Sequence, residues 1–243
     1  MAKNAPLPNR NAILFQSINE TAEHAVPMGY ISIVRTAKIE QRRQIIADFT
    51  HLCDPYVASV PDMFEKALTG LMTQGVDGHD VDSLMRAAGV TVKNDSNGNA
   101  YESALGQFRR FGAAIGRPPG LPKLMEAEII IKKSCDRMLH LASSNRFGVA
   151  VGALTLSDYL WSSLLDHLGI ILRDEPMVRP VDIGFFAVER IWTNNGRQFF
   201  DLATAAACSP EIERSIRFGV AQATVIQKDM FDLLENRARL LSV

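Results

Sequence analysis

A carboxylate lies inside the apolar stripe of the segment IGFFAVERIWTNNGRQFF, residues 183–200. If this segment is a helix, Glu189 falls within roughly 40–60° of both Phe185 and Trp192, because each residue turns the helix by about 100°. Burying an isolated carboxylate is costly unless the group is paired or binds a metal. The pattern therefore indicates either a buried ion pair with an arginine or a functional site.

Three further carboxylates lie on other predicted helices. Asp158 borders the face that contains Trp161, Glu65 flanks the face that contains Phe64, and Glu102 lies in the first turn after the loop NDSNGN. Each alone has an ordinary explanation, an exposed position or a favourable interaction with the helix dipole. If they converge in a bundle core, they would bind a hard or borderline divalent metal. The expected ligands are Glu65, Glu102, Asp158 and Glu189, with Asn94 and Asp95 as further candidates.

Aromatic residues close to these carboxylates in the sequence are expected to line a substrate pocket. Sites in helical bundles lie between helices and combine apolar walls with a few inward-pointing polar groups. Such a pocket suits a small and largely apolar substrate. The residues expected to line it are Tyr101, Trp161, Phe185, Phe186 and Trp192.

The elements that would position these residues are helices. Helical periodicity dominates the chain, no convincing alternating strand pattern occurs, and loops rich in Gly, Pro, Asn and Asp separate the segments. No internal repeat or linker divides the chain, so we expect one all-α domain over residues 1–243, with a flexible N-terminus at 1–10. The bundle of about seven to nine helices is expected at 11–24, 37–59, 62–74, 79–88, 100–116, 122–143, 147–171, 182–207 and 210–240, the second and third forming either two helices or one bent at Pro61.

Composition excludes several classes of protein. The 26 Lys and Arg nearly balance the 27 Asp and Glu, so neither nucleic acid nor an anionic membrane is an expected partner. The apolar stretches are too short to cross a bilayer. Three scattered cysteines fit a reducing cytoplasm, and the five histidines lack zinc-ligand spacing. We therefore expect a cytoplasmic protein.

The order of these features resembles the haem-oxygenase-like superfamily, and the resemblance extends over most of the chain. QRRQIIADFTHLCDPYVASVPDMF is similar to that family's early helix pair, whose second member supplies a metal-binding Glu. GNAYESALGQFRRFGAAIG is similar to the helix that ends in Phe-Arg-Arg. VGALTLSD resembles a Gly-Ala segment in which Asp158 takes the position of a Glu ligand. FFAVERIWTNNGRQFFDLA and SPEIERSIRFGVAQATVIQKDMFDLLE are similar to the last two helices.

The resemblance is strongest to the non-haem diiron oxidase and oxygenase branch, related to thiaminase II and pyrroloquinoline quinone synthase. It implies a homodimer, oxidative chemistry on a small molecule, and no haem. The family's His-x3-Asp-x2-His motif corresponds here to Glu189, Thr193 and Gly196, so its histidine ligands are missing. The resemblance therefore implies an atypical, carboxylate-rich iron or manganese site in a tailoring enzyme.

Two alternatives remain open. NDSNGNAYE has the spacing of the metal-binding motif of class I terpene synthases, which predicts Mg²⁺ and a prenyl diphosphate substrate. The second alternative is a metal-free, thiaminase-like catalyst with Cys135 as nucleophile, or a pseudoenzyme that only binds its partner. The expected phosphate contacts in the first alternative are Arg109, Arg110, Arg190 and Arg197.

Overall fold

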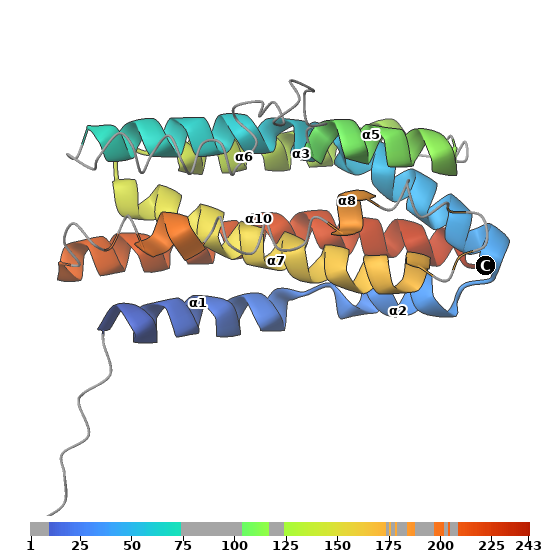
Figure 1. The fold of residues 1–243 in the computed structure, drawn as a ribbon, viewed down its shortest axis with the longest axis horizontal. Coiled ribbons are helices and arrows are strands. Elements are labelled where there is room, and N and C mark those ends of the chain that lie inside the picture. The colour runs from blue at the N-terminus through green and yellow to red at the C-terminus, as the bar shows by residue number, and fades with distance from the viewer. Residues whose placement is uncertain are drawn as a thin grey trace, which may run out of the picture.

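The computed structural model (Figure 1) is a bundle of helices, and the residues it describes contain no strand. The expected all-α bundle is confirmed. The described residues are 10–73, 104–116, 124–173, 175, 178, 184–187, 197–201, 204 and 209–243. Their helices are α1 (Arg10–Ala25), α2 (Met28–Thr36), α3 (Ile39–Met72), α5 (Ala104–Ile115), α6 (Leu124–Ala142), α7 (Phe147–Arg173), α8 (Gly184–Ala187) and α10 (Pro210–Leu241).

The helices α7 and α10 lie side by side at the centre of the bundle and run in the same direction (Figure 1). The helices α1 and α2 cover one side of this pair, and α3, α5 and α6 lie on the other. Most of α7 is buried along its whole length, including small residues as well as large apolar ones. The helix α6, in contrast, is buried on one side only, and Met125 and Ile129 on it face solvent.

Glycines allow the backbones of α7 and α10 to touch. A Cβ atom at Gly152 of α7 would overlap the backbone carbonyl oxygen of Ile216, and one at Gly219 of α10 would overlap that of Val149. Neither of these two carbonyl oxygens can move aside, because both belong to the backbone of a helix. Only glycine therefore permits this close approach, which brings the side chains farther along the two helices into contact.

The segment 28–36 forms a helix that the sequence pattern did not predict. Pro and Gly often end helices, but here Pro27 precedes α2 and Gly29 lies inside its first turn. A Cβ atom at Gly29 would overlap the carboxylate of Glu235 on α10. A larger residue at this position would therefore require the Glu235 side chain to move aside.

The end of α2 is fixed by a side chain from the next helix. The Arg42 guanidinium donates hydrogen bonds to the carbonyl oxygens of Val34, Arg35 and Ala37, at 2.8, 3.0 and 2.9 Å. It also pairs with Glu175, just beyond the end of α7. These bonds satisfy carbonyls that a helix C-terminus leaves without intrahelical donors.

Of the two alternatives for residues 37–74, the single long helix is confirmed. The helix α3 is continuous through both Pro55 and Pro61. The other described helices agree with the prediction to within a few residues. The helix expected at 79–88 lies outside the described residues, and of the one expected at 182–207 the structure describes α8 and the helical residues 197–201 and 204.

A buried ion pair joins α3 to α10. Arg237 donates two hydrogen bonds to Asp48, each 2.6 Å long, and both side chains are almost fully buried. The bidentate geometry neutralises both charges at once.

Among the described helices, none is long and apolar enough to cross a membrane.

Replacing Gly152 with alanine is expected to destabilise the protein by about 1–3 kcal/mol or more, because the new methyl group meets fixed backbone. Gly70→Ala is the matched control: a Cβ atom there meets nothing within 4 Å, so the change should stabilise α3 by roughly 0.5–1 kcal/mol. Urea unfolding followed by circular dichroism measures both. Equal stability of Gly152→Ala and the unmodified protein would contradict the packing described above.

Asp48→Asn should cost about 3–5 kcal/mol, since it leaves the Arg237 charge buried without a counterion. The exposed pair Lys228–Asp232 provides the control, and Asp232→Asn should cost less than about 1 kcal/mol. The same unfolding measurement compares them. A loss at Asp48 no larger than at Asp232 would show that the buried pair contributes little.

Candidate functional site

A narrow cavity lies between α3, α7 and α8. Its walls are aliphatic and aromatic apart from one carboxylate and two hydroxyl groups. The free space is about 20 Å³, room for about one water molecule. The residues that line it are Tyr56, Val57, Val60, Met63 and Phe64 of α3, Leu154, Ser157, Asp158, Trp161 and Leu165 of α7, and Phe185 of α8.

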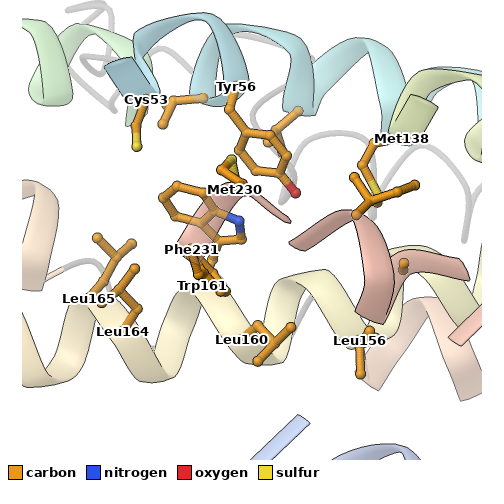
Figure 2. Close-up of a cluster of buried hydrophobic side chains, with 14 of the residues drawn as sticks. Cys53, Tyr56, Met138, Leu156, Leu160, Trp161, Leu164, Leu165, Met230 and Phe231 are labelled. Carbon is orange, nitrogen blue, oxygen red and sulfur yellow. The ribbon is translucent and has the colours of Figure 1, made fainter. Parts of the chain in front are cut away.

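Stacked aromatic rings form one wall of this cavity. Tyr56 and Trp161 face each other between α3 and α7, beside Phe231 of α10 (Figure 2). The rings of Tyr56 and Trp161 are 4.7 Å apart and nearly parallel, at 14°. Both side chains are buried, so the rings offer a flat apolar surface to a small molecule.

A hydrogen-bond network joins this wall to α10. The indole Nε1 of Trp161 donates to Oε1 of Gln227 at 3.2 Å. Nε2 of Gln227 donates to the hydroxyl of Tyr56 at 2.7 Å and to that of Ser157 at 3.0 Å. The Ser157 hydroxyl lies 4.0 Å from the sulfur of Met138. The network therefore fixes the positions of both hydroxyl groups at the cavity.

The network was missed at the sequence level, although its signal was present. Gln227 is fully buried and lies in the apolar stripe of α10 beside Ile226, Met230 and Leu234. This is the same pattern, a polar residue inside an apolar stripe, that drew attention to Glu189. Applied to every helix, it would have found Gln227 too.

The predicted metal ligands differ in burial, and several of them lie outside the described residues. Asp158 is buried, with 5 % of its surface exposed, and lines the cavity. Glu65 is exposed, on the opposite side of α3 from its buried neighbours Met63 and Phe64. The other predicted ligands, Glu102, Glu189, Asn94 and Asp95, lie outside the described residues.

Some of the predicted pocket residues line the cavity, and others lie outside the described residues. Trp161 and Phe185 line the cavity. Phe186 is buried next to them, and its ring packs edge-on against Phe111 of α5 at 4.7 Å. Tyr101 and Trp192 lie outside the described residues.

The arginines expected to meet phosphate groups have other interactions. Arg109 is exposed and donates to both carboxylate oxygens of Asp54, at 2.7 and 2.9 Å. Arg197 pairs with Asp201 and covers the ring of Phe15. Arg110 is exposed, Arg190 lies outside the described residues, and so does the whole of NDSNGNAYE. Nothing in the described part of the chain favours diphosphate binding.

The described residues alone do not form a metal site. They contain no group of three or more His, Cys, Asp or Glu side chains that could hold a metal ion. The cavity itself supplies one carboxylate and no imidazole, whereas iron and manganese need several such donors. A carboxylate-rich site therefore depends on Glu102 and Glu189, and it stays a prediction.

The thiols of Cys53 and Cys135 are buried. Burial raises the pKa of both, and for Cys135 it raises the pKa from 9.0 to about 11. The attacking species in thiol catalysis is the thiolate. A raised pKa therefore weighs against Cys135 as a nucleophile near neutral pH.

The same shift predicts a loss of stability in alkaline solution. Since Cys135 holds its proton more tightly when folded, its contribution is complete below pH 9 and is lost as the pH rises through about 11. The loss is on the order of 2 kcal/mol. Urea unfolding at intervals from pH 8 to 11 measures it.

Cys135→Ala is the control for this prediction. Its unfolding free energy should fall less steeply than that of the unmodified protein between pH 9 and 10, before most tyrosines ionise. An identical slope in the two proteins would assign the loss to other groups.

Comparison with known proteins identifies the family of this chain and two structures that share its fold. No curated protein matches the chain. A crystal structure of a CADD-like protein of unknown function from Nostoc punctiforme superposes with a TM-score of 0.68 at 14% identity, over 96% of this chain and 97% of that one. A second structure with the same description gives 0.63 at 12%, over 94% and 98%. At such low identity the likeness concerns the fold. In sequence, residues 21–241 match DUF6975, a family of unknown function, and the chain belongs to that family.

Proposed function

We propose that the protein is an enzyme that acts on a small, largely apolar molecule in the cavity between α3, α7 and α8. The observation that carries the proposal is Asp158, a carboxylate buried among aromatic and aliphatic side chains at the wall of a cavity. Burying a carboxylate in mostly apolar surroundings is costly. Such groups are characteristic of sites that bind a ligand or transfer a proton.

The neighbouring side chains support a role in binding. The stacked rings of Tyr56 and Trp161 would contact the apolar body of the substrate, and Phe185 closes the cavity from α8. With room for about one water molecule, the cavity must widen to admit a substrate. Exclusion of water would strengthen electrostatic interactions of Asp158 with the bound molecule.

Oxidation is the reaction class that we propose, on the haem-oxygenase-like resemblance of the sequence and on the fold shared with the CADD-like protein. In this proposal iron or manganese is held by Asp158 together with Glu102 and Glu189, and supplies the chemistry that activates oxygen. The described residues supply the first of these three carboxylates. Glu65 is left out of the ligand set because its side chain is exposed.

Asp158→Asn tests the proposal, with Glu65→Gln as the matched control. Protein loaded with Fe(II) without oxygen and then desalted is analysed for metal by plasma mass spectrometry. Asp158→Asn should retain roughly tenfold less iron or manganese, because it removes a ligand charge. Glu65→Gln should retain as much as the unmodified protein.

Different outcomes separate the parts of the proposal. Equal metal content in Asp158→Asn would exclude Asp158 as a ligand, and a loss in Glu65→Gln would contradict the placement of Glu65. If the unmodified protein retains no transition metal, metal-dependent oxidation is wrong, and Asp158 must act as an acid or base.

A further inference from the structure

The orientation of the Gln227 amide decides where the hydrogen atoms of the buried network point. The indole N–H of Trp161 can only donate, so the Gln227 atom 3.2 Å away must be the acceptor, Oε1. Nε2 then faces Tyr56 and Ser157, at 2.7 and 3.0 Å. Its two hydrogen atoms go to the two hydroxyl oxygens, and it has no lone pair to accept from either.

The hydroxyl hydrogens of Tyr56 and Ser157 therefore need other acceptors. Tyr56 can donate to Ser157, but the Ser157 hydrogen then has the sulfur of Met138, 4.0 Å away, which is a weak acceptor. Among the hydrogen bonds of the described residues, at least one hydroxyl hydrogen lacks an oxygen acceptor. Leaving such a buried donor unsatisfied is costly.

An acceptor for this hydroxyl hydrogen would fit in the cavity. Tyr56 and Ser157 both line it, next to Asp158, and its free space of about 20 Å³ holds about one water molecule. A water molecule there would accept the hydroxyl hydrogen. A substrate can displace that water without loss only if it brings an acceptor oxygen of its own.

We propose that Gln227 orients the hydroxyl groups of Tyr56 and Ser157 so that one of them donates a hydrogen bond into the cavity, and that the site binds its substrate through a neutral carbonyl oxygen. The oxygen belongs to a neutral group because the walls of the cavity are mostly apolar, and burying a charged carboxylate there is costly. Gln227 is a positioning residue, since it acts through the two hydroxyls. The inference rests on the proposed function, because it concerns the ligand of the same cavity.

Gln227→Glu keeps the shape of the side chain but reverses the direction of its hydrogen bonds to Tyr56 and Ser157. One carboxylate oxygen still accepts from Trp161, but the other replaces Nε2 and accepts the hydroxyl hydrogens of Tyr56 and Ser157. The hydroxyl group that donated into the cavity then turns away from it. Tyr56→Phe and Ser157→Ala remove the donors themselves, and they keep the inference testable if Gln227→Glu does not fold.

Three small probes distinguish the contributions to binding. Acetone carries a neutral carbonyl, isobutene has the same shape without an acceptor, and acetate carries a charge. Binding at pH 8 is followed by the methyl NMR signals of Val57, Val60, Leu154 and Leu165, which line the cavity.

In the unmodified protein, acetone should bind about tenfold more tightly than isobutene, and acetate more weakly than acetone. Gln227→Glu should weaken acetone binding about tenfold and change isobutene binding less than about twofold. A merely structural role of Gln227 would weaken both probes equally, because both need an intact cavity.

The contrary outcomes are distinguishable. If acetone and isobutene bind equally well, or if Gln227→Glu and the two donor-removing variants leave acetone binding unchanged, the donor arrangement is wrong while the cavity stands as a binding site. If acetate binds more tightly than acetone, the ligand class is wrong. If neither acetone nor acetate perturbs these methyl groups at molar concentration, both this inference and the proposed function fail.

Discussion

The direct backbone contact between α7 and α10 is the constraint on which the other packing depends. At Gly152 and Gly219 the helices approach until no side-chain atom fits between them. Farther along the same pair of helices, the side chains of Trp161 and Gln227 meet, one from each helix. Larger residues at the glycine positions would separate the helices, and the hydrogen bond between these two side chains would lengthen with them.

Two sets of polar side chains in the core join different helices through hydrogen bonds. Asp48 and Arg237 form two short hydrogen bonds between α3 and α10, and Gln227 uses all of its amide hydrogens. Buried polar groups stabilise a fold poorly, but they restrict which partners can pack together. Here they fix the register of α3 against α10, which is also what brings Tyr56 to the cavity.

The cavity differs from the rest of the core in its chemistry. Its walls are mostly apolar, like the surrounding core, but a carboxylate and two hydroxyl groups lie on adjacent turns of α3 and α7. The family match and the shared fold with a CADD-like protein identify neither a substrate nor a reaction. The chemistry available in the cavity therefore depends on these three groups, and Gln227 of α10 orients the two hydroxyl groups.

The sequence by itself determined that the chain is helical, where most helices begin and end, and that Asp158 borders an apolar face. These features follow from local periodicity and from Gly and Pro positions, which act over a few residues. Only the tertiary structure decided that Gly29 lies within a helix, that Glu65 faces solvent, and that Gln227 contacts Tyr56. The position of Gln227 depends on a partner far away in the chain, Tyr56 of α3. A helix pattern states which residues share a face, but which neighbour that face meets is settled only when the helices pack.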